Sequence, residues 1–198
     1  MPRQTLNEQE TRDLILDRAY ALFADIGYNK TTIGDIAKAC GFSAANVHKH
    51  FGTKSAINQA IASVMLDEKL KEGRAAVARH RSASKKLKAL IKTVHESTLE
   101  SFRHRVKVYD TLAAAAEEKW EAIRAYRLEL MSMVRDIVTL GCESGEFSVK
   151  DVDKATQAIH MAVTRVIHPA NVVEMIGEPD AGDIDTLTDF LLAALGKK

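Results

Sequence analysis

Apolar residues recur every three or four positions along most of this chain, which is the spacing of one face of an α-helix. The alternation of apolar and polar residues that is typical of half-buried β-strands is missing, and only three prolines interrupt the pattern. The first helix is expected to start after Asn7, with Glu10 at the capping-box position, and to end at Gly27. The chain is therefore predicted to be all-α.

Residues 31–54 are predicted to form two short helices joined by a tight turn. Thr32 is placed to cap the first of them, with Asp35 three positions later to complete a capping box. Gly41 stands where a helix commonly ends in a left-handed residue. Ser43 is then expected to cap the second helix.

The second of these helices, from Ala44 to about Phe51, starts with small residues and ends with basic ones. Val47 and Phe51 lie four positions apart, so one face is apolar and can pack on the first helix. The other face is slim enough to enter a DNA major groove and carries hydrogen-bond donors. Two helices of an ordinary core explain the apolar spacing equally well, but not the small start and the basic end. The pattern therefore favours a DNA-binding helix-turn-helix.

A long helix is expected next, from Lys54 to about Arg79, with Thr53 as its cap and with Gly73 loosening its far end. At about 1.5 Å per residue it reaches about 40 Å, which is enough to bridge two domains. The predicted organisation is a three-helix domain of residues 1–56, joined by this helix to a C-terminal helical bundle within residues 57–198.

The C-terminal bundle is predicted to contain five further helices, with Gly141 and Gly145 ending the third of them. The last two helices carry more apolar surface than one face of a bundle requires, and they are predicted to form a two-fold dimer interface. The alternative is that both pack entirely within their own bundle. The expected bounds are Ser82 or Ser84 to Phe102, residues 106–116, Lys119 to about Glu143, residue 152 to before Pro169, and Ile184 to about Leu195.

Composition and charge narrow the class of protein. The formal net charge is only +1, so the overall charge does not by itself indicate a nucleic-acid partner. Acidic residues gather in the C-terminal half, away from the proposed DNA-binding end, although solvated helix faces explain most individual charges equally well. Cys40 and Cys142 stand far apart and are expected to stay reduced, and no apolar run is long enough to span a membrane. These features predict a soluble, cytoplasmic protein with no membrane partner.

The motifs in about the first 60 residues resemble those of the tetracycline-repressor (TetR) family of bacterial transcription regulators. The later sequence Gly145–Phe147, followed by an acidic helix start, is similar to the C-terminal domain of that family. The resemblance implies a homodimer of all-α subunits that binds operator DNA and carries a larger domain for a small-molecule inducer. The residues that carry it are Ile15, Ala19, Leu22, Phe23, Gly27, Tyr28, Thr31, Thr32, Ile36, Ala37, Gly41, Ser43, His48–Phe51 and Lys54.

Carried over position by position, the resemblance assigns DNA contacts to the helix-turn-helix. Ala45 and Asn46 would face base edges, where asparagine can bond bidentately to adenine. Lys49 would meet a phosphate or a guanine. His48 stands where the family usually has tyrosine, and DNA affinity is expected to depend on pH because imidazole titrates near neutral pH. The phosphate contacts are assigned to Thr32, His48, His50, Thr53 and Lys54, and the full DNA-binding set adds Ser43, Ala44, Ala45, Asn46 and Lys49.

An inducer pocket is predicted from polar or adaptable residues within the apolar stripes of residues 57–198, the implied ligand-binding and dimerisation domain. Each of them alone is more often an ordinary core residue, but together they indicate a mostly apolar pocket for an aromatic, lipophilic or weakly acidic compound. A fully packed bundle would instead indicate a ligand-independent DNA-binding adaptor or architectural protein. The candidate residues are His95, Thr98, Phe102, Tyr109, Trp120, Tyr126, Met131, His160, Met161 and Thr164.

A metal site is the competing chemistry. Glu100 and His104 lie four positions apart on one predicted helix, near His95 and Glu96, and such a pair can ligate a metal. No matching motif stands on another helix, and two neighbouring arginines add positive charge, so solvent-exposed polar residues are the favoured interpretation. The chain contains no G-x-S-x-G, P-loop or glycine-rich nucleotide motif. It is therefore expected to be no enzyme and to hold neither a metal nor a cofactor.

Overall fold

The computed structural model describes residues 6–104, 121–168, 171 and 183–196 of the chain. All regular secondary structure in these residues is helical, which confirms the all-α prediction. The expected helix over residues 106–116, and the start of the one expected from residue 119, lie outside the described residues. The helices are α1 (Glu8–Ile26), α2 (Ile33–Cys40), α3 (Ala44–His50), α4 (Lys54–Ala78), α5 (Ala83–His104), α7 (Glu121–Glu143), α8 (Val152–Ile167) and α10 (Ile184–Ala194).

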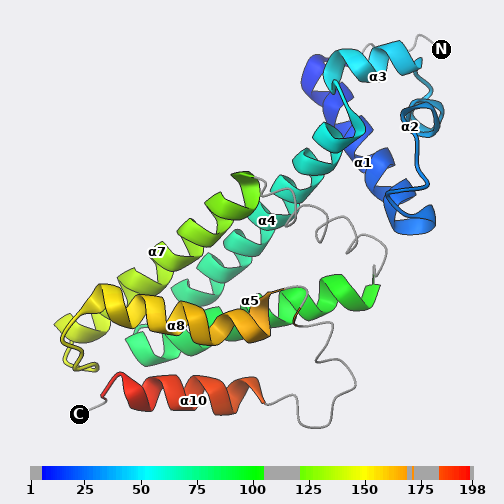
Figure 1. The fold of residues 1–198 in the computed structure, drawn as a ribbon. Helices are drawn as coiled ribbons and strands as arrows, with labels where there is room; N and C mark the ends of the chain where they lie inside the picture. Colours follow the sequence, from blue (N-terminus) through cyan, green and yellow to red (C-terminus); the bar gives the residue numbers. More distant parts are fainter. Residues whose placement is uncertain (1–5, 105–120, 169–170, 172–182, 197–198) are drawn as a thin grey trace. The chain divides into compact units, whose positions relative to one another are not determined.

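The described residues fall into two compact units, and α4 contributes to both. The N-terminal unit contains residues 6–65 and 121–122, and Figure 1 shows α1, α2 and α3 around the first turns of α4. The first turns of α4 complete the N-terminal core, and the domain boundary expected at residue 56 stays a prediction. This core is made of Ile15, Ala19, Phe23, Ile36, Ala37, Val47, Phe51, Ile57 and Ile61.

Local capping fixes the ends of the N-terminal helices as the sequence predicts. The Asn7 side chain accepts from the Glu10 N–H, and the Glu10 carboxylate accepts from the Asn7 N–H in return. Thr32 and Asp35 form the same reciprocal pair at the start of α2. Gly41 ends α2 with φ +71°, a left-handed conformation that L side chains adopt rarely.

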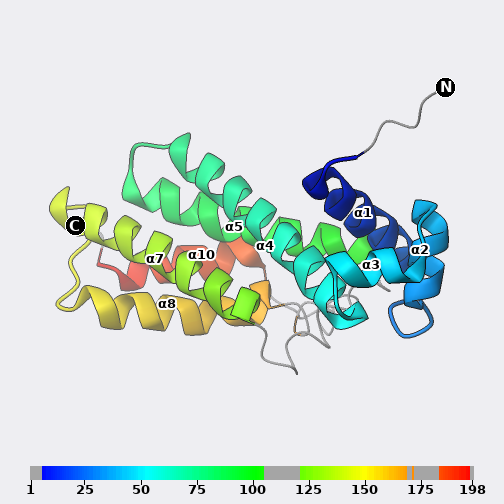
Figure 2. The ribbon, with the colours of Figure 1, turned by 90° about the horizontal axis from the view of Figure 1, so that it is seen from above.

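The C-terminal unit contains the described residues from 66 to 104 and from 123 onward. Helices α5, α7, α8 and α10 share one apolar core, and α10 packs on both α5 and α8 (Figure 2). The last two helices therefore do pack into their own bundle on one face. On their other faces Met161 and Phe190 are 76% and 70% exposed, which is unusual for large apolar side chains. The dimer interface expected there stays a prediction.

Two glycines have roles that the sequence did not predict. Gly73 does not loosen α4, which continues to Ala78; a Cβ at position 73 would lie 3.0 Å from Leu90 Cδ1, so the glycine lets α4 approach α5 closely. Gly141 does not end α7 either, because the helix runs on to Glu143 and the Phe147 ring occupies the place of a side chain at position 141. Both glycines are packing positions rather than helix breakers.

Two further expectations concern cysteines and membranes. Cys40 and Cys142 are both free thiols, as expected from their separation in the sequence. Across the described ranges, no helix combines the length and the apolar character that crossing a bilayer requires.

Candidate functional site

The turn between α2 and α3 presents the second helix with its polar face outward. The N–H of Phe42 donates to the Ala37 carbonyl at 2.8 Å, which closes the end of α2 around Gly41. Ser43 Oγ then accepts from the Asn46 N–H at 3.2 Å and starts α3. Val47 is fully buried in the N-terminal core. Because α3 is only 7 residues long, one buried stripe leaves the remaining surface of the helix exposed.

The exposed surface of α3 carries the residues predicted to read bases. Ala44 and Ala45 are exposed at the start of the helix, where no long side chain blocks approach to a flat surface. Asn46 is half-buried, and its side-chain amide makes no hydrogen bond to another described residue, so both its donor and acceptor groups are available to a base edge. Lys49 is exposed one turn further along. Ala45, Asn46 and Lys49 lie within about 100° of one another around α3 and share one face, whereas Ala44 lies about 200° from Asn46.

Arg12 of α1 is a positioning residue that the sequence did not reveal. Its guanidinium donates from Nη1 to the His50 carbonyl at 2.6 Å and lies 4.1 Å from the centroid of the Phe51 ring. The carbonyls at the end of a helix lack intrahelical partners and carry partial negative charge, so a cation there is stabilising. Arg12 therefore fixes the C-terminal end of α3, and with it the angle at which α3 leaves the core.

Lys54 has an internal role in addition to its predicted phosphate contact. Its ammonium donates to the carbonyls of Tyr28 and Thr31, both at 2.8 Å, and lies 4.3 Å from the centroid of the Tyr28 ring. These bonds tie the first turn of α4 to the turn between α1 and α2. An ammonium has three donors, so one N–H remains for a phosphate.

Other predicted phosphate contacts also serve as helix caps. The Thr32 hydroxyl donates to the Asp35 carboxylate at 2.7 Å, and the hydroxyl and N–H of Thr32 together hold the pKa of Asp35 below its usual value. The Thr53 side chain accepts from the Ala56 N–H at 3.0 Å and caps α4, as predicted. The donor of Thr32 is thus engaged in this conformation, whereas Thr53 keeps its hydroxyl proton for a phosphate.

His48 is exposed, and its Nδ1 lies 3.1 Å from the Gly52 carbonyl. A carbonyl can only accept, so Nδ1 carries the proton in this contact. In a neutral ring Nε2 then has a lone pair and repels a phosphate oxygen. Only the protonated ring offers an Nε2–H donor and a positive charge to DNA.

The C-terminal unit encloses an apolar crevice between α5, α7 and α8. Two of the predicted pocket residues, Met131 and His160, line this crevice. Burial lowers the pKa of His160, and the positive charge of the nearby Arg127 lowers it further. The crevice holds about 10 Å³, roughly the space of one water molecule. Its other lining residues are Leu90, Ile91, Val94, Leu130, Val134, Val163 and Ile167.

The remaining predicted pocket residues are divided by the structure. His95 and Thr98 face α8, where His95 Nδ1 lies 2.5 Å from the Val166 carbonyl. Met161 lies about 200° around α8 from the buried Ile159 and is 76% exposed, and its place in the pocket stays a prediction. Tyr126 and Thr164 are half-buried in α7 and α8. The Phe102 side chain, Tyr109 and Trp120 lie outside the described residues.

Lys69 of α4 is a buried cation that the sequence pattern did not single out. It is only 8% exposed, and Nζ donates to the Thr98 hydroxyl at 3.3 Å, its sole hydrogen bond to a described residue. Burial lowers the pKa of Lys69 to about 8, and the nearby Glu72 carboxylate opposes this shift in part. Tyr126 shares this environment, since burial and Glu72 raise the pKa of its phenol to about 12.

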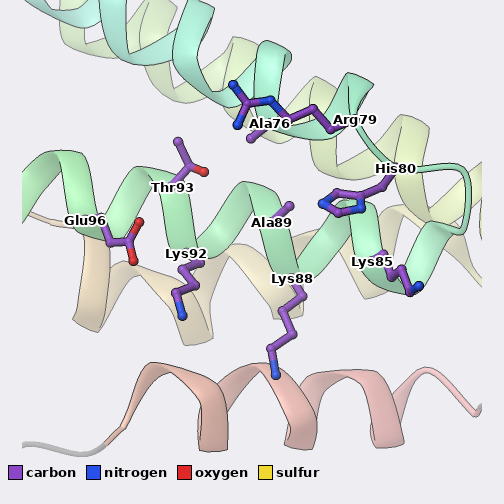
Figure 3. A pocket seen from close by; sticks show the side chains of 9 residues that line it. All are labelled: Ala76, Arg79, His80, Lys85, Lys88, Ala89, Lys92, Thr93 and Glu96. Atoms are coloured by element: carbon purple, nitrogen blue, oxygen red, sulfur yellow. The ribbon is translucent and has the colours of Figure 1, made fainter.

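A groove of about 330 Å³ opens on the surface of the C-terminal unit between the end of α4 and α5. It is lined by several basic side chains, but Figure 3 shows Lys88 extending away from the groove toward α10. The Lys88 ammonium pairs there with Asp185 and Asp189, both at 3.1 Å, and Lys92 pairs with Asp185 at 3.8 Å. The two lysines thus hold α10 against α5, and their charges are engaged in that contact.

The described residues contain no cluster of metal-ligating side chains that would support the alternative of a metal site. Among the described residues, no group of three or more histidine, cysteine, aspartate or glutamate side chains is arranged to hold a metal ion. The His104 side chain lies outside this description.

Two regions of the chain match models of known protein families. Residues 15–61 match the model described as bacterial regulatory proteins, tetR family. Residues 83–185, more than half of the chain, match the model described as tetracyclin repressor-like, C-terminal domain. The two matches cover the helix-turn-helix and most of the C-terminal bundle.

Individual relatives are regulators of transcription. The HTH-type transcriptional repressor KstR2 of Rhodococcus jostii (strain RHA1) is 26% identical over 151 residues, which are 75% of this chain and 73% of that protein. The HTH-type transcriptional regulator AcrR of Shigella flexneri is 46% identical over 56 residues, but these span 28% of this chain and 26% of AcrR. The stronger identity to AcrR therefore comes from a short segment.

Solved structures share the fold over nearly the whole length. The fatty acid degradation regulator FadR from Bacillus halodurans has a TM-score of 0.70 at 18% identity, covering 98% of this chain and all of that one (100%). A TetR/AcrR-family regulator from Thermobifida fusca has a TM-score of 0.70 at 22% identity, covering 94% and 97%. At these identities the likeness establishes the fold alone.

Proposed function

This chain belongs to the TetR family of transcriptional regulators, and from that premise we propose that it is a homodimeric repressor that a small molecule releases from a palindromic operator. It is a DNA-binding regulator of transcription and not an enzyme. The observation that carries the proposal is α3, a short helix capped by Ser43 whose exposed surface carries small and polar side chains. A repressor of this kind acts in the bacterial cytoplasm, where the operator lies.

Base reading by α3 depends chiefly on Asn46. Its amide makes no hydrogen bond to another described residue and can donate to and accept from one adenine, while the adjacent Ala45 can contact a thymine methyl. Replacing Asn46 with alanine is expected to reduce the preference for operator over random DNA by about 1–3 kcal/mol. Fluorescence anisotropy with both DNAs measures this difference, with Lys54→Met as the control because the loss of a phosphate contact weakens binding to both DNAs alike. Equal losses for the two DNAs in Asn46→Ala would refute the base contact.

His48 is expected to make operator binding stronger at acidic pH. Its Nδ1 proton is engaged by Gly52, so only protonation at Nε2 adds a donor and a charge that face the DNA. Affinity for the operator should therefore be lower at about pH 8 than at about pH 6. The control is His48→Tyr, which should bind with nearly constant affinity over the same range. A wild-type profile as flat as that of the variant would exclude His48 as the cause.

The proposed homodimer uses the outer faces of α8 and α10. Met161 and Phe190 are large apolar side chains left in contact with water, and a second copy of the same surface would cover them. We expect Phe190→Asp to sediment at the mass of one 21.8 kDa chain instead of two. Val64→Asp, at a residue of α4 that is 54% exposed, is the control and should leave the dimer intact. A dimeric Phe190→Asp would place the interface elsewhere.

The release mechanism relies on α4 because the helix contributes to both cores. Ile57 and Ile61 pack in the N-terminal core, while Gly73 contacts Leu90 of the C-terminal unit. The apolar crevice is too small for any ligand larger than water, so a ligand enters it only by separating α5, α7 or α8. Binding and a change in helix positions are then the same event. About 1–3 kcal/mol of coupling would reduce operator affinity roughly 5- to 150-fold.

The closed crevice also favours a second function, that of a ligand-independent DNA-binding adaptor. The two functions differ in what the C-terminal unit binds. A panel of lipophilic and weakly acidic compounds that neither raises the melting temperature nor releases operator DNA supports the adaptor. The buried charge of Lys69 favours ligand response, because a core that serves only packing has no use for a buried ammonium, even one whose charge Glu72 balances in part.

A further inference from the structure

Lys69 and Thr98 form a buried polar pair in the C-terminal unit. Lys69 is 8% exposed and Thr98 is 3% exposed. The Thr98 hydroxyl donates to the Val94 carbonyl at 2.8 Å, and the same oxygen accepts from Lys69 Nζ at 3.3 Å. An ammonium has three donors, and among the described residues only this one acceptor contacts it. Among the described residues, this buried charge therefore has a single hydrogen-bond acceptor.

The pair lies at one end of the apolar crevice. Thr98 Oγ1 is 2.8 Å from the Val94 carbonyl and 3.4 Å from the Ile167 carbonyl, and both of these residues line the crevice. Lys69 thereby places a cation beside a space whose walls are almost entirely aliphatic. Apolar walls with one charged group at the end complement a molecule that has an apolar body and one charged end.

We propose that the effector of this regulator is an amphiphilic carboxylic acid whose carboxylate pairs with the Lys69 ammonium, beside Thr98, while its apolar body lies between α5, α7 and α8. This inference rests on the proposed ligand response and names the chemical class of the ligand. The carboxylate adds a negative charge and further acceptors beside the ammonium, for which the described residues provide one acceptor. The ligand also widens the crevice, which links recognition of the acid to movement of the helices.

The charges around the pair favour a carboxylate over a phosphate. Among the described residues, Lys69 is the only cation that contacts Thr98. Arg74, another cation of α4, is paired with Glu129 at 2.6 Å. Glu72 lies on the solvent side of α4 and partly balances the charge of Lys69, so the site suits one added negative charge better than two. Of the other titratable groups on the facing helices, His95 contacts the Val166 carbonyl, and Tyr126 lies near Glu72. His160 lines the crevice, with Arg127 nearby.

The test compares octanoate with octanol, which share a chain but differ in the charged end. Isothermal titration calorimetry of the intact protein near pH 7.5 is expected to show octanoate binding about 10- to 100-fold more tightly than octanol, as a charge-assisted hydrogen bond would produce. Above about pH 8, octanoate affinity should fall as Lys69 loses its proton, and octanol affinity should not. Equal affinities for the two compounds, or no binding of octanoate, overturn the proposal.

Matched variants identify Lys69 as the cause. Lys69→Met keeps the apolar stem and should remove the preference for octanoate without weakening octanol. Lys71→Met is the control, since Lys71 lies on the same helix but is exposed and pairs with Glu68 at 2.6 Å; it should behave as the wild type. A preference for octanoate that persists in Lys69→Met refutes the role of Lys69.

Operator binding separates this inference from the proposed function. Octanoate should release operator DNA from the wild type and from Lys71→Met but not from Lys69→Met, while all three proteins bind the operator equally without ligand. If octanol and octanoate release the wild type from the operator equally well, the proposed ligand response stands, but the proposal that the ligand must be a carboxylic acid is refuted. A wild type that binds no operator in the absence of ligand contradicts the proposed function itself.

Discussion

Replacing Lys54 with methionine is expected to destabilise the N-terminal unit by about 2–4 kcal/mol and to weaken binding to every DNA sequence alike. The substitution removes two charge-assisted hydrogen bonds, to Tyr28 and Thr31, and the cation above the Tyr28 ring. Thr31 is 1% exposed, so its carbonyl would lose a partner where water has little access. Since the bonds hold the start of α4 to the turn before α2, their loss displaces α3 from its support.

The position of Lys54 on its helix supports this interpretation. It is the first residue of α4, and a cation in the first turn opposes the helix dipole. A lysine is tolerated there because the two carbonyls, and in the complex a phosphate, compensate that cost. Urea unfolding measures the loss of stability. Binding to operator and random DNA over a range of salt concentrations measures the loss of the phosphate contact.

Lys49→Met is the matched control for Lys54→Met. Lys49 is exposed on α3 and its ammonium makes no hydrogen bond to a described residue. The control should keep wild-type stability, whereas Lys54→Met should flatten the dependence of log affinity on log salt by about 0.9 for one lost phosphate contact. If Lys54→Met is as stable as the control, the two carbonyl bonds contribute nothing and Lys54 serves DNA alone.

The elements that sequence predicted correctly are those fixed by residues close together in the chain. Asn7 with Glu10, and Thr32 with Asp35, form capping boxes three positions apart, so each helix start is encoded locally. The same holds for Gly41, whose left-handed conformation needs no distant contact. The helix-turn-helix was therefore predictable from about twenty consecutive residues.

The features that sequence missed depend on contacts between distant residues. Arg12 meets the end of α3 38 positions later, and Lys69 meets Thr98 29 positions later. Helical periodicity treats a lysine as a solvent-facing residue and cannot place one inside a core. The prediction that Gly141 ends α7 was wrong for the same reason, because this glycine makes room for the Phe147 ring, a contact that the local sequence does not reveal. Composition within a helix does not reveal which neighbour packs on it.

Function and stability are in conflict at Lys69, and the conflict predicts a stabilised variant. Near pH 7.5, Lys69→Met is expected to raise the free energy of unfolding by up to about 3 kcal/mol, since it removes a desolvated charge and leaves an apolar side chain. The Thr98 hydroxyl keeps its bond to Val94, so the substitution creates no unpaired donor. Lys71→Met, on the exposed face of the same helix, should change stability much less.

The pH dependence of stability identifies the charge as the cause. The pKa of Lys69 is about 8 in the folded protein, against 10.5 for an ordinary lysine. Between these values the unfolded chain holds a proton that the folded chain has released, so the wild type becomes more stable as the pH rises. Below about pH 8 both states are protonated and the full cost of burying the charge remains. The advantage of Lys69→Met should therefore be largest there and disappear towards about pH 10.5. Urea unfolding at about pH 7.5 and pH 10 measures this difference, and equal differences at both values would show that Lys69 is not a buried charge.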